Sequence, residues 1–283
     1  MKTIKLVDEL KEEIKRWKHK GQSVAFVPTM GNLHQGHLSL VKEAKKKADC
    51  VVASIFVNPT QFGVGEDFET YPRTELEDRT KLEQHNTNLL FLPDLMEMYP
   101  QGSKTVVEVQ GLSGMHCGKS RPGHFCGVAT IVCKLLNMVQ PDTAFFGKKD
   151  FQQWVIIRSL VRDLNLPVEI EGVATVREND GLAMSSRNNY LSATQRQIAP
   201  KLYQSLCAAR DEIIAGRVDF KTIEKQQFQI LQQAGFGPDY FSICRTCDLQ
   251  SAGDDDPEIV ILTAAKLGKT RLIDNIQVSR TVL

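Results

Sequence analysis

The sequence predicts an α/β protein, a Rossmann-like doubly wound parallel sheet with a second, smaller α+β C-terminal domain. In the first half, short apolar runs alternate with amphipathic segments, the pattern of parallel strands joined by helices. Beyond about Arg177 this pattern changes to helical segments followed by strands. The chain has 283 residues, more than one compact core usually fills, so we expect two domains, residues 1–176 and 177–283.

Hydrophobic periodicity gives the elements of the first domain. Cys50–Val57 is a continuous run rich in β-branched residues, typical of a strand covered on both faces. The other predicted strands are Ser23–Val27, Leu89–Leu92, Asp142–Phe146 and Val168–Val173. The predicted helices are Leu6–His19, Gly36–Ala48, Thr74–His85, Phe125–Val139 and Asp150–Leu164.

The second domain is predicted to be smaller and of the α+β type. Ala193–Ala215 and Phe220–Ala234 have the periodicity of helices. Tyr240–Cys244, Glu258–Lys266 and Thr270–Asn275 have the composition of strands. Helices followed by neighbouring strands favour an antiparallel sheet packed against the helices.

Composition and charge exclude several classes of protein. The formal net charge is +1 and 42% of residues are hydrophobic, so no overall field favours nucleic acid or a membrane surface. The N-terminus resembles neither a signal peptide nor a membrane anchor. The seven cysteines lie mostly in apolar segments, which favours reduced thiols, and Cys244 and Cys247 lack a second ligand pair for zinc. We therefore expect a cytoplasmic protein that binds neither nucleic acid nor membrane.

Polar segments follow several of the predicted strands. They are Pro28–His37, Asn58–Gly63, Gly147–Asp150 and Met184–Asn188. In an open parallel sheet, ligands bind outside the carboxyl ends of the strands. We expect these segments to meet at one edge of the sheet and to form a binding site there.

The stretch PTMGNLHQGH offers donors for an anion. Gly36 lets the backbone approach a ligand closely, and the following helix directs free N–H groups and its positive dipole end outward. His34 and His37 add imidazole donors, so a phosphate chain is the natural ligand. Two alternatives are a pair of capping histidines and a metal site, although a metal usually needs a third ligand.

Two later segments strengthen the phosphate interpretation. Lys149 is predicted at a helix N-terminus, where the dipole repels a cation unless an anion is bound. Ser185–Arg187 offers two hydroxyls and a guanidinium, a good phosphate grip. The alternatives are a lysine that points to solvent and a turn with a helix cap.

Neutral amides suit a small polar substrate. Gln61 and Gln153 are able to bind a hydroxyl and a carboxylate without a charge penalty. Arg121 and His124 precede another predicted helix, and capping and function weigh about equally for them.

The order and spacing of these blocks resemble the pantothenate synthetase (pantoate–β-alanine ligase) family. The matching blocks are PTMGNLHQGH, SIFVNPTQF, YPRT, RPGHFCGVAT, FGKKDFQQ, DGLAMSSRNNYL and LGKTRLIDN. HQGH alone resembles the HxGH signature of the nucleotidyltransferase superfamily, whereas the full set resembles the ligase family. The resemblance covers most of the chain.

The resemblance implies an ATP-dependent reaction in two steps. Pantoate attacks the α-phosphate of ATP to give pantoyl adenylate and pyrophosphate, and β-alanine then converts the adenylate to pantothenate and AMP. Residues 1–176 would bind ATP and pantoate, and residues 177–283 would close over the active site. The resemblance also implies Mg²⁺, near the helix that carries Glu77 and Asp78, and a homodimer.

The resemblance also assigns roles to residues at matching positions. Catalysis would involve His34, His37, Lys149 and Arg187, with His37 as a proton donor. ATP would contact Met30, Gly31, Asn32, Leu33, His34, Gln35, Gly36, His37, Gly147, Lys148, Lys149, Asp150, Val176, Met184, Ser185, Ser186 and Arg187. The other substrates would contact Asn58, Gln61, Arg121, His124 and Gln153.

Three other functions compete with this one. A nucleotidyltransferase that acts on a phosphorylated acceptor would keep HxGH but would need cations where this chain has Gln61 and Gln153. A regulatory nucleotide-binding protein would be expected to have lost some of His34, His37, Lys149 and Arg187. A metal hydrolase would use His34, His37 and His124.

Overall fold

The computed structural model describes residues 1–280. By its internal contacts the chain divides into two compact units. The N-terminal unit comprises Met1–Lys148 and Ile156–Ala174, and the C-terminal unit comprises Lys149–Val155 and Thr175–Leu283. Within residues 1–280, no helix is both long and apolar enough to cross a bilayer.

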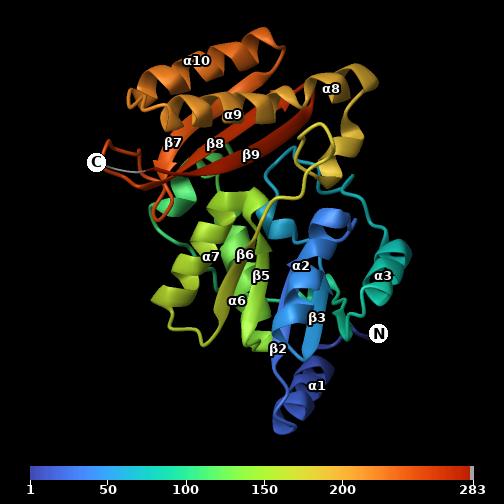
Figure 1. The fold of residues 1–283 in the computed structure, drawn as a ribbon. Helices are drawn as coiled ribbons and strands as arrows, with labels where there is room; N and C mark the ends of the chain where they lie inside the picture. The colour runs from blue at the N-terminus through green and yellow to red at the C-terminus, as the bar shows by residue number, and fades with distance from the viewer. Residues whose placement is uncertain (281–283) are drawn as a thin grey trace. The chain divides into compact units, whose positions relative to one another are not determined.

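The N-terminal unit is built on a six-stranded parallel sheet, which confirms the predicted α/β class (Figure 1). Its strand order is β1-β4-β3-β2-β5-β6. The strands are β1 (Lys2–Ile4), β2 (Val24–Thr29), β3 (Cys50–Ile55), β4 (Leu89–Phe91), β5 (Thr143–Gly147) and β6 (Glu169–Val173). From β2 the chain winds outward through β3 to β4, and then returns to place β5 on the other side of β2. The crevice expected at such a reversal lies at the carboxyl ends of β2 and β5.

Helices connect the strands of this unit. They are α1 (Val7–His19), α2 (Gln35–Lys47), α3 (Glu75–Gln84), α4 (Leu95–Met98), α5 (Cys117–Ser120), α6 (His124–Val139) and α7 (Phe151–Asp163). Helices α4 and α5, of four residues each, were not predicted from the sequence, whereas the other five were. Short 3-10 turns lie at η1 (Pro59–Gln61), η2 (Leu112–Gly114) and η3 (Lys148–Asp150). Every residue of β3 is buried, as expected of a central strand covered on both faces. The first residues of α7 belong to the C-terminal unit.

Strand β1 was not predicted from the sequence. It pairs in parallel with β4, with Lys2 opposite Leu89 and Ile4 opposite Phe91. Of its three residues only Ile4 is buried, so the hydrophobic pattern is too short to indicate a strand. The backbone of β4 supplies the hydrogen-bonding partners that make this segment extended.

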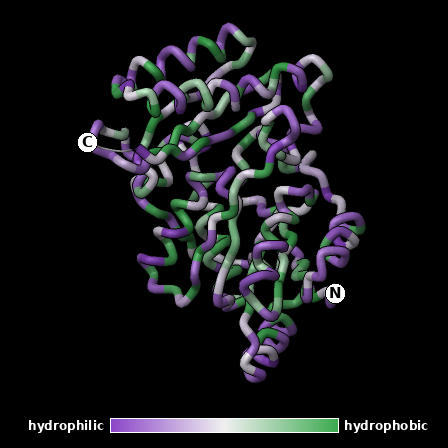
Figure 2. The backbone as a smooth tube through the Cα atoms, in the orientation of Figure 1, coloured by the Kyte–Doolittle hydropathy of each residue, from purple (hydrophilic) through white to green (hydrophobic). Residues whose placement is uncertain are grey.

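The C-terminal unit contains a three-stranded antiparallel sheet, as predicted (Figure 1). Its strands are β7 (Gly237–Arg245), β8 (Glu258–Leu267) and β9 (Thr270–Ser279), in that order. The helices are α8 (Ala193–Ile198), α9 (Lys201–Ile214) and α10 (Phe220–Gln233), preceded by the 3-10 turn η4 (Ser186–Tyr190). Helices α9 and α10 bury apolar residues in one core with the strands, and Figure 2 shows both helices alternating in hydropathy along their length.

One predicted helix is in fact two. The sequence pattern predicts a single helix over Ala193–Ala215, but α8 ends at Ile198 and α9 begins at Lys201. Pro200 lies at the break. Proline has no N–H to donate and its ring clashes with the preceding turn, so the helix restarts there although the apolar periodicity continues.

Candidate active site

His34 and His37 lie at the N-terminus of α2, directly after β2. His34 is the N-cap residue, and its Nδ1 accepts a hydrogen bond from the Gly36 N–H at 3.1 Å. The Nδ1 of His37 accepts from the His34 N–H at 3.3 Å, and the two ring centroids lie 4.1 Å apart. The two imidazoles therefore cap the helix as a reciprocal pair, which was one of the alternatives open at the level of sequence.

This capping fixes the chemistry of each ring. A ring nitrogen that accepts an N–H hydrogen bond carries no proton, so a neutral imidazole here has its proton on Nε2. Both rings thus have Nε2–H as the donor, while Nδ1 serves the backbone. Capping and function are compatible because they use different nitrogens.

The loop between β2 and α2 is held by Asp78 of α3. The buried Asp78 carboxylate accepts hydrogen bonds from the N–H groups of Asn32 at 2.8 Å and Leu33 at 2.7 Å. The Thr74 hydroxyl donates to the same carboxylate at 3.1 Å. Asn32 has a positive φ of 49°, a conformation that asparagine tolerates better than most residues. The carboxylate thereby stabilises the backbone shape that presents the histidine pair.

Gln61 and Asn58 follow β3 and are both buried. The Asn58 amide donates to Gln61 Oε1 at 3.1 Å, and the Gln61 amide donates to Met30 Sδ at 3.0 Å. Asn58 Oδ1 accepts in turn from the Tyr99 hydroxyl at 2.9 Å. Since Gln61 Oε1 is occupied and a thioether is a weak acceptor, the Gln61 amide N–H is the group that a stronger acceptor would engage.

Gly127 of α6 allows this arrangement. A Cβ at this position would lie 2.3 Å from the carbonyl oxygen of Thr60 and 2.7 Å from the Gln61 nitrogen. The backbone of η1 therefore packs directly on α6. The Asn58 amide also donates to the Gly127 carbonyl at 3.2 Å.

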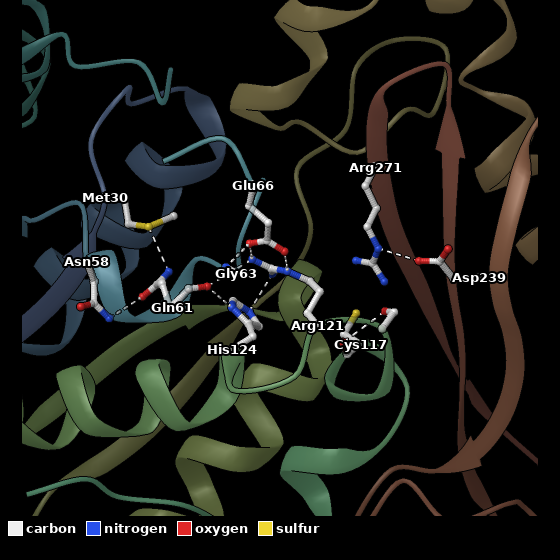
Figure 3. A network of polar contacts seen from close by, with 11 residues as sticks. Met30, Asn58, Gln61, Gly63, Glu66, Cys117, Arg121, His124, Asp239 and Arg271 are labelled. Atoms are coloured by element: carbon white, nitrogen blue, oxygen red, sulfur yellow. Dashed lines mark hydrogen bonds and ion pairs between the residues drawn. The ribbon is translucent and has the colours of Figure 1, made fainter. Parts of the chain in front are cut away.

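Arg121 and His124 contact the same turn from the start of α6 (Figure 3). Arg121 donates to both carboxylate oxygens of Glu66, at 2.6 and 2.5 Å, and to the Gln61 carbonyl at 3.3 Å. His124 Nδ1 lies 2.7 Å from the same carbonyl, and its Nε2 lies 2.9 Å from Arg121 Nη1. Met30, Asn58, Gln61, Arg121 and His124 thus form one connected set of hydrogen bonds.

The partners of His124 determine its tautomer. A carbonyl only accepts and a guanidinium only donates, so Nδ1 carries the proton and Nε2 accepts. Glu66 is strongly tied to this network: although partial burial opposes ionisation, the Arg121 guanidinium lowers the pKa of its carboxyl from 4.5 to about 2. Arg121 and His124 therefore hold the backbone of Gln61, and the Glu66 loop is fastened to them.

The remaining predicted residues lie in or beside the C-terminal unit. The boundary between the two units lies between Lys148 and Lys149. Gly147 and Lys148 belong to the N-terminal unit, and Lys149 and Asp150 belong to the C-terminal unit. The Lys149 ammonium lies 3.8 Å from the Asp150 carboxylate. Gln153 lies on the first turn of α7 and is partly exposed.

Met184–Arg187 follows a short hairpin in the C-terminal unit. Met184 N donates to the Val176 carbonyl at 3.0 Å, and Arg177 pairs with Ala183 in a bridge. The Ser185 hydroxyl accepts from the Arg187 N–H at 3.3 Å and caps η4. Ser185 is therefore a cap, as the sequence alternative suggested, and the hairpin brings Val176 beside Met184.

No protein cage for a metal ion is found among residues 1–280. In that range no group of three or more His, Cys, Asp or Glu side chains is placed to hold an ion. The oxygens of Asp78, near which the resemblance placed magnesium, accept backbone N–H groups instead.

Three residues of the site, Glu66, Tyr99 and Gly127, were not predicted from the sequence, and Asp78 was expected only near magnesium. All four support predicted site residues through the contacts described. A buried carboxylate or a close glycine contact leaves no local signal in the sequence. Gly127 alone among them lies inside a matching block, RPGHFCGVAT.

The fold defines a class, the Rossmann-like α/β proteins, whose ligands bind where the strand order reverses. The comparisons with known proteins then specify the family. The model of the family "Pantoate-beta-alanine ligase" matches residues 2–277. The chain belongs to this family and is an enzyme of the ligase class.

Curated relatives and solved structures agree over nearly the full length. The chain is 52% identical to pantothenate synthetase of Colwellia psychrerythraea over 286 residues, covering 99% of each protein. It is 54% identical to that of Shewanella loihica, covering 99% of this chain and 100% of the relative. The crystal structure of pantothenate synthetase from Thermus thermophilus superposes with a TM-score of 0.92 at 45% identity, covering 98% of this chain and 99% of that chain. A pantoate-beta-alanine ligase from Francisella tularensis, complexed with beta-gamma ATP and beta-alanine, gives 0.82 at 35% identity and covers 98% and 97%.

Proposed function

We propose that this enzyme condenses (R)-pantoate with β-alanine in an ATP-dependent reaction, through a pantoyl adenylate, and releases AMP and pyrophosphate. Family membership supports the overall reaction. The single observation that carries the chemistry is the reciprocal histidine cap at the N-terminus of α2, beside the reversal of strand order. It presents two Nε2–H donors at the helix N-terminus, while the Nδ1 atoms accept from backbone N–H groups.

In the first step a carboxylate oxygen of pantoate attacks the α-phosphorus, and the bond to the bridging oxygen of pyrophosphate breaks. Both reactants are anions, so charge must be offset where it accumulates in the transition state. His34 and His37 donate from Nε2 to phosphate oxygens, and His37 is the proton donor for the leaving group. Lys149 and Arg187 supply full positive charge to the same phosphates.

Binding of pantoate is assigned to neutral groups. The Gln61 amide, held by Asn58 and resting on Met30 Sδ, exchanges this weak acceptor for an oxygen of pantoate. Gln153 is the second amide. Neutral donors hold the carboxylate without lowering its nucleophilicity as much as a salt bridge would.

In the second step the amine of β-alanine attacks the acyl carbon, and the bond to the AMP oxygen breaks. The mixed anhydride is sensitive to water, so the site must exclude solvent while the adenylate waits. We assign this task to the domain of residues 177–283. We assign Arg121 and His124 to the β-alanine side, where they would act through their hydrogen bonds to the Gln61 carbonyl.

Mg²⁺ enters this proposal as the companion of the ATP phosphates. The described residues fit an ion held by the phosphates better than an ion held by protein side chains, because the Asp78 carboxylate already accepts hydrogen bonds from backbone N–H groups. The ion would neutralise phosphate charge. No protein ligand is assigned to it.

The test is pyrophosphate release from ATP and Mg²⁺, with and without pantoate and β-alanine. We expect release that depends on pantoate, followed by AMP and pantothenate formation that depends on β-alanine. Release that ignores pantoate would contradict the proposal and would favour another HxGH enzyme.

The family resemblance further supports a cytoplasmic homodimer. Its mass in solution tests the assembly: light scattering should give about twice the 31.7 kDa of one chain. A value equal to one chain would contradict the homodimer and leave the reaction unaffected.

A further inference from the structure

An ion pair with a buried carboxylate lies in the C-terminal unit, and its aspartate belongs to the LGKTRLIDN block, to which no role has been assigned. The carboxylate of Asp274, on β9, accepts two hydrogen bonds from the Arg177 guanidinium. The distances are 2.7 Å from Nη1 to Oδ2 and 3.0 Å from Nη2 to Oδ1. A charge this well buried needs a specific reason, since removing two ions from water is costly.

The Arg177 guanidinium makes further contacts with the hairpin that it begins. Nη1 donates to the Gly181 carbonyl at 3.0 Å, and the guanidinium carbon lies 3.6 Å from the centre of the Tyr203 ring. Gly181 has a φ of 92°, and a Cβ there would lie 2.7 Å from the same ring. Arg177 is therefore fixed between a carboxylate, an aromatic face and the turn of its own hairpin.

Fixing Arg177 also fixes the segment before Met184. Glu178 N donates to the Leu182 carbonyl at 2.8 Å, and Met184 N donates to the Val176 carbonyl at 3.0 Å. The hairpin thus transmits the position of Arg177 to Val176 and Met184. The family resemblance assigns both residues to the ATP site, where Val176 would contact adenine and Met184 would lie beside the phosphates.

The neighbouring residue reaches a second nucleotide-binding segment. The buried Asn275 donates from Nδ2 to the carbonyl of Lys149 at 2.9 Å. Its backbone N–H donates to Asp274 Oδ1 at 2.8 Å, and its carbonyl accepts from Arg177 Nη2 at 3.3 Å. Two consecutive residues of β9 thereby touch both Lys149 and the hairpin.

Electrostatics agrees with this arrangement. Burial raises the pKa of the Asp274 carboxyl, and the positive charges of Arg177 and Lys149 oppose that rise. The pair is therefore sensitive to the loss of either partner. If Asp274 and Asn275 served packing alone, apolar side chains could replace them. Apolar side chains would form no hydrogen bond with the Arg177 guanidinium or with the Lys149 carbonyl.

We propose that Asp274 and Asn275 are positioning residues for ATP: they lock the Lys149 segment and the Val176–Met184 hairpin into one register. This inference rests on the proposed function, because it assigns those segments to the nucleotide. Asp274 and Asn275 do not touch the reacting atoms. They determine where Lys149 and Arg187 lie when ATP binds.

The test compares Asn275→Ala and Asp274→Asn with Asp248→Asn. Asp248 is ion-paired to Arg245 in the same unit and its side chain is 41% exposed, so Asp248→Asn removes the same charge with no link to Lys149. Steady-state kinetics would give KM for ATP, KM for pantoate and kcat, with ATP affinity measured separately by calorimetry. Thermal melting reports the folded fraction.

We expect Asn275→Ala to raise KM and Kd for ATP about fivefold, the value of one hydrogen bond, and to change KM for pantoate less. Asp274→Asn should raise them further, and Asp248→Asn should leave them unchanged. A merely structural role would lower the melting temperature and kcat without moving the affinity for ATP.

Unchanged ATP affinity in folded Asn275→Ala would overturn the proposal, even if Asp274→Asn failed to fold. A failure of the proposed function looks different, because the wild-type enzyme would then release pyrophosphate without dependence on pantoate. In that case the calorimetric comparison of ATP binding still decides the role of Asn275.

Discussion

The two units hold their functional groups in different ways. In the N-terminal unit, Arg121 and Glu66 form a pair whose side chains are 15% and 25% exposed, and the histidines are tied to the backbone by neutral hydrogen bonds. In the C-terminal unit, Arg177 is paired with an Asp274 side chain that is only 2% exposed. The two arginines are similarly exposed, at 15% and 19%, so the units differ in the burial of the carboxylate.

This difference predicts how each unit responds to damage. A partly exposed pair that loses one partner leaves a charge that water can solvate, whereas a buried pair leaves an unsolvated charge. Loss of its ion pair should change the stability of the N-terminal unit little, whereas disturbing the close backbone packing of η1 on α6 should change it more. The C-terminal unit should be most sensitive to loss of charge.

The largest effect is expected for Arg177→Met. It leaves the Asp274 carboxylate buried without its guanidinium, so the free energy of unfolding should fall by about 3–5 kcal/mol. Urea unfolding followed by tryptophan fluorescence measures this loss. Arg177→Lys keeps the positive charge but cannot donate to both carboxylate oxygens as the guanidinium does, so its free energy of unfolding should fall less. Equal losses for the two variants would show that geometry, and not charge, dominates this pair.

His37→Ala should have the next largest effect, and on rate instead of stability. Loss of the Nε2–H donor should slow pantoyl adenylate formation roughly 100-fold to 1000-fold, because one donor to a transition-state charge is removed. Pantoate-dependent pyrophosphate release measures the rate. His19→Ala, an exposed histidine of α1, is the control. Turnover of His37→Ala close to that of His19→Ala would contradict the assigned role.

Gly127→Ala tests backbone fit in the N-terminal unit. The new Cβ would lie 2.3 Å from the Thr60 carbonyl oxygen, so η1 must move, at about 1–3 kcal/mol. Because Gln61 ends η1, KM for pantoate should rise more than KM for ATP. Gly114→Ala provides the matched control, since a Cβ there meets nothing within 4 Å. Similar KM values for pantoate in both variants would show that the position of η1 does not affect pantoate binding.

Glu66→Gln should have the smallest effect, and it should depend on pH. The folded-state pKa of Glu66 is lowered from 4.5 to about 2, so its stabilising contribution is complete above 4.5 and is lost as the pH falls towards 2. Near neutral pH, thermal unfolding should show Glu66→Gln to be less stable by about 1 kcal/mol. The gap between variant and wild type should close between about pH 4.5 and pH 2. A gap independent of pH would indicate that Glu66 acts by shape and not by charge.

Much of the fold follows from local sequence pattern. The alternation of β-branched runs with amphipathic segments predicted the parallel sheet, because the spacing of apolar residues in each segment shows which of its faces is buried. Strand β1 and the break at Pro200 were missed for opposite reasons. The strand is made by its partner β4, whereas the proline interrupts a helix whose apolar pattern continues.

The sequence by itself also determined the polar segments after the strands, the histidine pair and the family resemblance. Only the tertiary structure decided how these groups are supported. Asp78 holds Leu33 across 45 residues, Arg121 holds Glu66 across 55, and Arg177 holds Asp274 across 97. Spacing along the chain carries no record of such contacts, because which side chains meet depends on how distant segments pack.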